Sequence, residues 1–293
     1  MKPAPFDYLA PSSLADALAL LQAHGDQAKL MAGGQSLMPM LNMRLARPKV
    51  LIDLGGLDEL RYIRDAGSHL AFGALTRQRA VERSAEVAAR LPLLHEAILN
   101  VAHPQIRNRG TIGGSLAHAD PASELACVAA CLDAEFTAVG PEGERTIPAA
   151  EFFLTYYTTT LMEGEVLTEV RFPLPAPGTG SAFIELSRRH GDFALVGVAC
   201  SLTLNAAGAI ATARVALTGV GGTPVRAAAT EAALLGAAPE PAALQSAAAQ
   251  AAEGLDPDSD IHASADYRLH LARVLTERAL AAAAARAKGG GAA

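Results

Sequence analysis

The hydrophobic pattern of the first 56 residues predicts one helix and two strands. Residues 14–24 (LADALALLQAH) have helical spacing and are followed by a glycine, a typical stop signal. Residues 28–32 (AKLMA) and 49–54 (KVLIDL) are short apolar runs that lead into glycine pairs, and both are typical of buried strands. The crossover between the two strands has the length expected of a small βαβ-type unit.

The middle of the chain has a mixed pattern of helices and strands. HLAFGAL (residues 69–75) alternates like a short strand, and residues 84–101 have helical periodicity with a break at a proline. Asp120 is expected to cap the next helix, which would place Glu124 in its first turn. The segment GEVLTEVRFPLP (residues 164–175) predicts a strand that closes this region.

A proline- and glycine-rich segment, residues 173–180 (PLPAPGTG), is the best candidate for a domain boundary. Beyond it, residues 193–222 predict two long strands around a turn, and the remainder predicts alanine-rich helices. Strands followed by helices favour an α+β domain. We therefore expect an α+β protein with a two-part N-terminal domain and a C-terminal domain. The expected ranges are 1–175, with subdomains 1–56 and 57–175, then 181–287 and a frayed tail at 288–293.

The composition narrows the class of protein. The chain of 293 residues is 51% hydrophobic and only 4% aromatic, and its net charge is −6. An acidic balance with few aromatic side chains gives no support to a nucleic-acid binder, which needs a basic stripe. No run of about 18 apolar residues predicts a membrane span, and the N-terminus lacks an apolar signal segment. These features predict a cytoplasmic protein.

The three cysteines, Cys127, Cys131 and Cys200, are too few for a disulfide framework and suit a reducing compartment. Cys127 and Cys131 lie four positions apart on one helix face, as a metal-ligand pair would. No further set of cysteine or histidine ligands accompanies them. Two small apolar residues in a helix core are therefore the favoured interpretation, and no metal site is expected.

Two glycine pairs, in AGGQSL (residues 32–37) and TIGGS (residues 111–115), carry the strongest chemical signal. Glycine lets a ligand approach the backbone, and the adjacent hydroxyl and amide side chains add hydrogen bonds, as a diphosphate requires. Neither pair fits the Rossmann or P-loop pattern, so a conventional NAD domain and a nucleotide triphosphatase are disfavoured. Two such loops could close on one diphosphate from opposite sides, but each alone is more typical of a structural turn. A third patch, GVGGTP (residues 219–224), is expected to be a plain turn.

Two titratable residues follow the second glycine pair. Glu124 is placed to accept hydrogen bonds from ribose hydroxyls, or simply to stabilise the N-terminus of its helix. His118 either faces the same ligand or fills its loop. No nucleophile lies at a spacing that would make His118 part of a catalytic triad.

These segments resemble the motifs of one known family when they are taken together. AGGQSLMPMLNMRLARPKVLIDL (32–54), TIGGSLAHADPASELACVAACLDA (111–134) and RRHGDFALVGVA (188–199) occur in the order found in the FAD-binding medium subunits of the molybdenum hydroxylases. This is the family of xanthine dehydrogenase and aerobic carbon monoxide dehydrogenase. The resemblance extends nearly from end to end, and it implies a two-part FAD-binding region followed by a C-terminal α+β domain.

The resemblance implies a role for each matching position. The first glycine segment would wrap the FAD diphosphate, and the second would meet it from the other side. Gly113 and Gly114 would be bare so that the diphosphate can approach them. Glu124 would bind the ribose, and His118 falls where a hydroxyl residue of the family contacts the cofactor. The implied cofactor-binding residues are Ala32, Gly33, Gly34, Gln35, Ser36, Leu37, Val101, Thr111, Gly114, Ser115, His118, Glu124, Leu167, Asp192 and Leu195.

The flavin ring would lie near Leu167, Asp192 and Leu195, and Val101 would give it an apolar contact. The basic residues 188–190 precede what we expect to be the first C-terminal strand. Their positive charge would favour a reduced anionic flavin, or they form an ordinary exposed turn.

The resemblance also implies the activity. The chain would be the electron-transfer subunit of a molybdopterin-dependent oxidoreductase, without a catalytic acid or base of its own. Electrons would leave the molybdopterin of a large subunit, cross two [2Fe–2S] clusters of a small subunit, and reach FAD here. The acceptor would be NAD, a quinone or oxygen, and the complex would hold two copies of each subunit. The alternatives are a stand-alone FAD oxidase or reductase and a non-catalytic binding protein.

Overall fold

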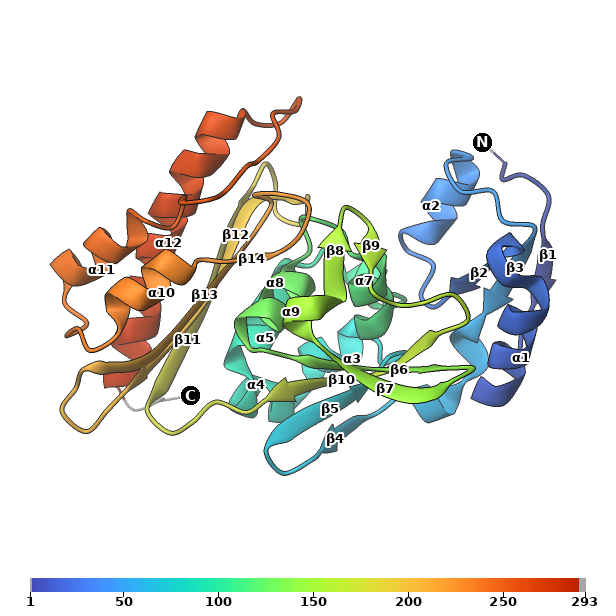
Figure 1. The fold of residues 1–293 in the computed structure, drawn as a ribbon, viewed down its shortest axis with the longest axis horizontal. Coiled ribbons are helices and arrows are strands. Elements are labelled where there is room, and N and C mark those ends of the chain that lie inside the picture. Colours follow the sequence, from blue (N-terminus) through green and yellow to red (C-terminus); the bar gives the residue numbers. More distant parts are fainter. Residues whose placement is uncertain (1, 290–293) are drawn as a thin grey trace.

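The structure is a computed structural model that describes residues 2–289, and its three main sheets follow one another across the molecule (Figure 1). The first sheet is parallel, with strand order β1–β3–β2, and α2 joins β2 to β3. The predicted βαβ-type unit is therefore present, and β1 is an additional edge strand that the sequence did not predict. The bounds are β1 Asp7–Leu9, α1 Leu14–His24, β2 Ala28–Met31, α2 Leu37–Asn42 and β3 Val50–Asp53.

The second sheet has five antiparallel strands in the order β4–β5–β10–β6–β7. Its strands are β4 Ile63–Asp65, β5 His69–Gly73, β6 Glu135–Gly140, β7 Gly143–Pro148 and β10 Val166–Pro173. A two-stranded hairpin, β8 Phe153–Thr155 and β9 Thr158–Thr159, lies beside it. The helices are α3 Gln78–Arg83, α4 Ala85–Arg90, α5 Pro92–Asn100, α6 Pro104–Arg107, α7 Ile112–His118, α8 Glu124–Cys131 and α9 Ala149–Phe152.

The third sheet is antiparallel, with order β11–β12–β13–β14. Its strands are β11 Thr179–Ser187, β12 Ala194–Leu204, β13 Ile210–Thr218 and β14 Val225–Arg226. The helices α10 Ala228–Leu234, α11 Pro241–Ala248 and α12 Ala265–Lys288 follow it in the chain. The α+β class is thus confirmed. The first strand after the proline-rich segment is β11, so residues 188–190 follow a strand rather than precede the first one.

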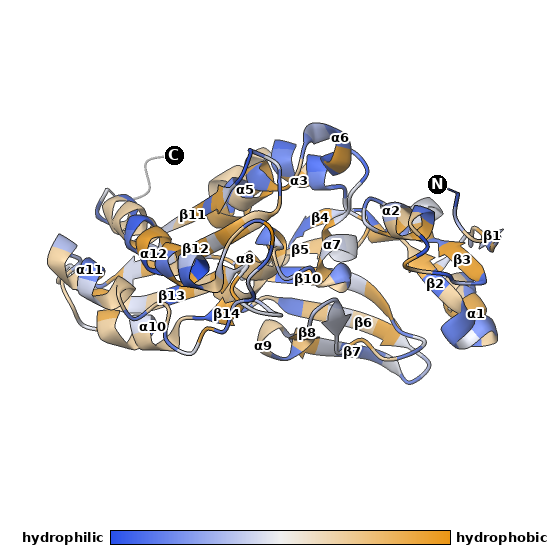
Figure 2. Cartoon of the chain, turned by 90° about the horizontal axis from the view of Figure 1, so that it is seen from above, coloured by the Kyte–Doolittle hydropathy of each residue, from blue (hydrophilic) through white to orange (hydrophobic). Residues whose placement is uncertain are grey.

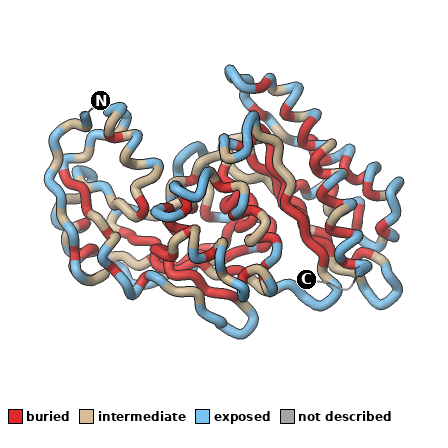
Figure 3. Tube along the Cα trace, turned by 180° about the vertical axis from the view of Figure 1, so that it is seen from behind, coloured by how far each residue is buried: buried red, intermediate tan, exposed pale blue. Residues whose placement is uncertain are grey.

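Three hydrophobic cores correspond to these sheets. Helices α5 and α8 pack on one face of the third sheet and share a core with the second, whereas α12 covers its other face. Strand β12 is consequently apolar and buried along most of its length, because both of its faces are covered (Figure 3). Strand β3, at the opposite end of the molecule, is also hydrophobic along most of its length (Figure 2).

The C-terminal helix extends to Lys288, one residue into the segment expected to fray. The Nζ atom of Lys288 donates a hydrogen bond to the carbonyl oxygen of Pro239 at 3.1 Å. The rest of the expected tail, residues 290–293, lies outside the described residues. Among residues 2–289, no helix combines the length and the apolar character that a membrane span requires.

Candidate functional site

A cavity of about 1670 Å³ lies where the three sheets approach one another. Pockets for ordinary small ligands measure roughly 300–1,000 Å³, so this one has room for an extended molecule. The fifteen cofactor-binding residues implied by the family resemblance all line it, although they come from stretches that lie far apart in the chain. They are Ala32, Gly33, Gly34, Gln35, Ser36, Leu37, Val101, Thr111, Gly114, Ser115, His118, Glu124, Leu167, Asp192 and Leu195.

The loop between β2 and α2 presents its backbone to the cavity. The N–H groups of residues 33–36 have no hydrogen-bond acceptor among the described residues. Gly34 has a φ of 72°, which favours glycine, and the Gln35 Nε2 atom donates to the Gly33 carbonyl oxygen at 2.9 Å. Unbonded N–H groups that line a cavity are suitable donors for an anionic ligand.

Gly33 has a separate reason to lack a side chain. A Cβ atom at this position would lie 2.3 Å from the carbonyl oxygen of Arg109 and 2.8 Å from the Cα atom of Gly110. The first glycine segment therefore touches the residues that lead directly into the second one. The two glycine segments are therefore in contact, which a site that closes on one diphosphate from opposite sides requires.

The second glycine segment is a helix rather than a loop. Thr111 is the N-cap of α7, and its Oγ1 atom accepts a hydrogen bond from the Gly114 N–H at 3.0 Å. The N–H groups of Ile112, Gly113 and Ser115 donate to backbone carbonyl oxygens. The backbone of α7 thus has no free donor at residues 112–115, and this segment can offer a ligand the N–H group of Thr111, which has no acceptor among the described residues, and the hydroxyl groups of Thr111 and Ser115.

The expectation that Gly113 is bare for the approach of a diphosphate is wrong. A Cβ atom at Gly113 would lie 2.5 Å from the Cβ atom of Ala74, so this glycine allows α7 to pack against the end of β5. At Gly114, a Cβ atom would lie 2.6 Å from Thr111 Oγ1 and 3.2 Å from the Cβ atom of Ala32. Both glycines are required by contacts within the protein.

Glu124 is the first residue of α8, but its helix cap differs from the prediction. Ser123 is the N-cap, and its Oγ atom accepts a hydrogen bond from Ala126 N–H at 3.3 Å. Asp120 instead accepts from Ala122 N–H at 2.9 Å and closes a turn before the helix. Asp120 is therefore wrong as the N-cap, because the turn inserts three residues between it and α8.

The side chain of Glu124 is only 9% exposed, and no lysine or arginine of the described residues forms an ion pair with it. Burial and, to a smaller extent, the nearby Asp120 raise its pKa to about 7, against a hydrogen bond from its own N–H that lowers it. A buried carboxyl without a cationic partner is a suitable acceptor for ligand hydroxyl groups.

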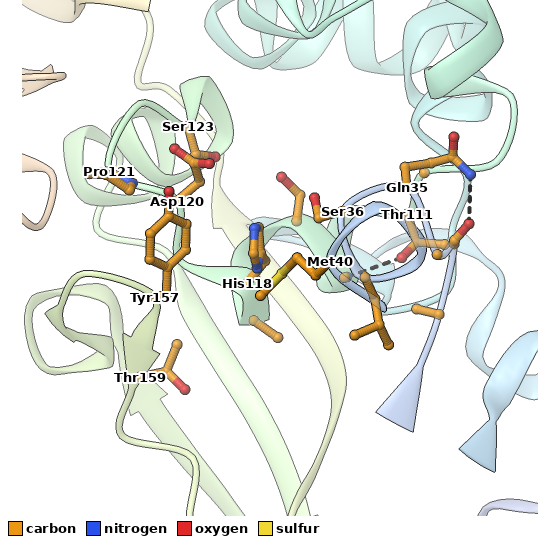
Figure 4. Close-up of a pocket in the computed structure, with 18 of the residues that line it drawn as sticks. Gln35, Ser36, Met40, Thr111, His118, Asp120, Pro121, Ser123, Tyr157 and Thr159 are labelled. Carbon is orange, nitrogen blue, oxygen red and sulfur yellow. Dashed lines mark hydrogen bonds between the residues drawn. The ribbon is translucent and has the colours of Figure 1, made fainter. Parts of the chain in front are cut away.

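Residues that the sequence did not single out complete this side of the cavity (Figure 4). The ring of Tyr157 packs against His118, with 5.1 Å between ring centroids. Tyr157 has a φ of 54°, and its N–H donates to the carbonyl oxygen of Ala119. Burial lowers the pKa of His118 and raises that of Asp120. No local sequence motif predicts that Tyr157 lies beside His118 and Asp120, because the β8–β9 hairpin brings Tyr157 to α7 only in the folded chain.

The remaining wall of the cavity combines apolar and charged residues. Leu167 on β10 and Leu195 on β12 are buried, whereas Asp192 is exposed in the β11–β12 turn. Of the basic residues 188–190, only Arg188 lines the cavity. Two glycines of residues 219–224 also line it, so the segment expected to be a plain turn contributes to the site.

These features fit FAD. The unbonded N–H groups at residues 33–36 suit a diphosphate, and the Glu124 carboxyl suits a ribose. The comparisons with known proteins point to the same cofactor. Residues 4–175 match the family model described as the FAD binding domain in molybdopterin dehydrogenase, and residues 181–283 match the C-terminal domain of the carbon monoxide dehydrogenase flavoprotein.

The chain belongs to the FAD-binding medium subunits of the molybdenum hydroxylases. A solved structure of carbon monoxide dehydrogenase from Hydrogenophaga pseudoflava is similar, with a TM-score of 0.95 and 46% identity, covering 98% of this chain and 99% of that one. The subunit alpha of the 6-hydroxypseudooxynicotine dehydrogenase complex of Paenarthrobacter nicotinovorans is 44% identical, over 98% of this chain and 97% of its own length. Quinoline 2-oxidoreductase from Pseudomonas putida 86 has a TM-score of 0.93 and 39% identity, covering 98% and 99%.

As a medium subunit, the protein is the flavoprotein part of an oxidoreductase complex. It binds FAD and transfers electrons, and its partners are a large molybdopterin subunit and a small iron–sulfur subunit. Nothing in the comparisons favours the alternative of a stand-alone flavoenzyme.

Proposed function

We propose that the cavity holds one FAD through the fifteen lining residues named above. The unbonded N–H groups of residues 33–36 would bind the diphosphate, together with the hydroxyl groups of Ser36, Thr111 and Ser115. Glu124 would accept hydrogen bonds from the ribose. The observation that carries this proposal is that the free donors and the unpaired carboxyl line one cavity.

The bound FAD would supply the redox chemistry, because a flavin can accept electrons singly and release them in pairs. The residues of this chain would bind and orient it. Leu167 and Leu195 would exclude water from one side of the ring, and we assign no acid or base to the electron transfer. The two matched family models support a division of the chain between residues 175 and 181.

We further propose a complex with two copies of each of three subunits, an external acceptor that is NAD, a quinone or oxygen, and a cytoplasmic location. The location is supported by three cysteines that are all buried and unpaired. The oxidised substrate is bound by the large subunit, so its identity is a property of that partner.

The direct test is to purify the chain with its partner subunits, denature it, and identify the released flavin by mass and amount. About one FAD per chain is expected, with iron and molybdenum present in the complex. FMN, or no flavin after incubation with FAD, would refute the proposal. Turnover of substrate by this chain alone would instead support the stand-alone flavoenzyme.

A further inference from the structure

The turn between α5 and α6 forms one wall of the cavity and has an unusual backbone conformation. Val101, Ala102 and His103 all line the cavity, and Val101 is one of the proposed FAD-binding residues. Ala102 has a φ of 43°, in the left-handed region that residues with a Cβ atom rarely adopt. Such a conformation persists only where the surrounding structure imposes it, so some contact must hold this turn in place.

The side chain of Arg107 on α6 supplies that contact. Its Nη1 atom donates hydrogen bonds to the carbonyl oxygens of Val101 at 2.8 Å and Ala102 at 3.1 Å, and no other described residue donates to either oxygen. Arg107 is only 5% exposed, and its Nε atom donates to the carboxylate of Glu82 on α3 at 2.9 Å. Glu82 also forms an ion pair with Arg79 at 2.5 Å. The guanidinium of Arg107 is therefore fixed by a carboxylate while it holds the turn.

The same turn contacts the part of the C-terminal domain that reaches the cavity. Gly191 lies in the β11–β12 turn, and a Cβ atom there would lie 2.3 Å from Cε1 of His103 and 2.9 Å from the carbonyl oxygen of Ala102. Asp192 and Leu195 follow Gly191 in the chain and are two of the proposed FAD-binding residues. A displacement of residues 101–103 would therefore be passed on to the β11–β12 turn by direct contact.

We propose that Arg107 is a positioning residue for the flavin. By holding the carbonyl oxygens of Val101 and Ala102, it keeps the turn in its left-handed conformation, so that Val101 presents its side chain to the ligand and the β11–β12 turn keeps its place. Lysine is a poor substitute, because an ammonium group lacks the planar fork that binds a carboxylate and carbonyl oxygens at once. This inference rests on the proposed function, because the ligand of the cavity is FAD.

The test measures the Kd of FAD and the visible circular dichroism of the bound flavin. It uses the full chain, stripped of flavin, at a temperature well below the unfolding midpoint of every variant. Arg107→Met should raise the Kd about tenfold or more and change the flavin dichroism. The matched control is Arg79→Met, which removes a partner of Glu82 that makes no hydrogen bond to the turn. It should keep the Kd within about twofold of wild type, with the same dichroism.

The substitution Ala102→Gly separates positioning from stability. Glycine adopts a positive φ without strain, so the double variant Arg107→Met/Ala102→Gly should regain part of the lost affinity although the buried pair with Glu82 is still absent. A merely structural role of Arg107 would not be relieved in this way. The inference is overturned if Arg107→Met and Arg79→Met bind FAD with the same Kd, or if the double variant regains no affinity.

A second measurement reads the turn without the ligand. In flavin-free chains, amide hydrogen exchange of a peptide spanning residues 98–108 should be faster in Arg107→Met than in wild type or Arg79→Met, and equal rates overturn the inference. If wild type binds no FAD, the proposed function fails, whereas the exchange rates still show whether Arg107 holds the turn. If Arg107→Met does not fold, Arg107→Lys replaces it in both measurements, with the same expected differences from Arg79→Met.

Discussion

The sharpest prediction concerns the pH dependence of FAD binding through Glu124. Its carboxyl is 9% exposed, and burial holds its pKa at about 7. An ionised carboxylate accepts hydrogen bonds from two hydroxyl groups, whereas a protonated one is a weaker acceptor. Below pH 7, FAD binding must therefore displace a proton from Glu124. Above pH 7 the carboxyl is already mostly ionised, so FAD binds without releasing a proton.

The size of the effect follows from the distance between the pH and the pKa. At pH 6, one unit below a pKa of about 7, roughly one molecule in ten has an ionised Glu124. The Kd of FAD should therefore be about tenfold higher at pH 6 than at pH 8, which corresponds to about 1.4 kcal/mol. The sign is fixed, because binding favours the ionised form and releases a proton on the acid side.

The assay is fluorescence quenching of FAD by the flavin-free chain at pH 6, 7 and 8. Glu124→Gln should remove the pH dependence in this range and bind at pH 8 more weakly than wild type. The loss of a charged acceptor is worth about 1.5–3 kcal/mol, or roughly tenfold to a hundredfold. The reasoning is refuted if the Kd of wild type is the same at pH 6 and pH 8, or if Glu124→Gln retains the full dependence.

Three further predictions follow from the same site. The double variant Ser36→Ala/Ser115→Ala should raise the Kd of FAD several-fold per lost hydrogen bond, while the exposed control Ser68→Ala should not change it. If the double variant and the control bind FAD with the same Kd, the two hydroxyl groups do not contact the ligand. Gly114→Val should lower the thermal midpoint as well as FAD content, because its side chain would displace Thr111; an unchanged midpoint with lost FAD would indicate a direct block of the ligand instead. Arg107→Ala should destabilise the fold by about 1.5–3 kcal/mol in chemical denaturation, since Glu82 loses its partner at 2.9 Å and keeps only Arg79; a loss below about 1 kcal/mol would contradict this.

Local hydrophobic patterns in the sequence predict much of the fold. The apolar runs before the glycine pairs are β2 and β3, and the two long apolar runs after residue 193 are β12 and β13. Strands β3, β12 and β13 are buried on one or both faces, so their composition alone identifies them. The prediction that β2 is a buried strand is wrong, because its residues are only partly buried or exposed at the edge of the first sheet. By contrast, β1 has only three residues, and the second half of β11 is only partly buried, so neither gives a strong periodic signal.

The proposed FAD-binding residues could be named because their motifs resemble those of a family, and all of them line one cavity. The contacts among the residues of this cavity could not be named in the same way. The group formed by His118, Asp120 and Tyr157 could not be predicted, because residue 157 reaches the others through a hairpin.

The two glycine pairs show why a motif can be right while its explanation is wrong. Both are bare, yet Gly33 and Gly113 are bare because another part of the backbone occupies the space where a side chain would be. Residues 33–36 keep their N–H groups free, whereas those of α7 are already bonded within the protein. The first segment can therefore act as the donor, and the second as the support that holds it in place. A larger residue at Gly33, Gly113 or Gly114 should therefore disturb FAD binding mainly through the fold, whereas Ser36→Ala or Ser115→Ala should act on the ligand directly.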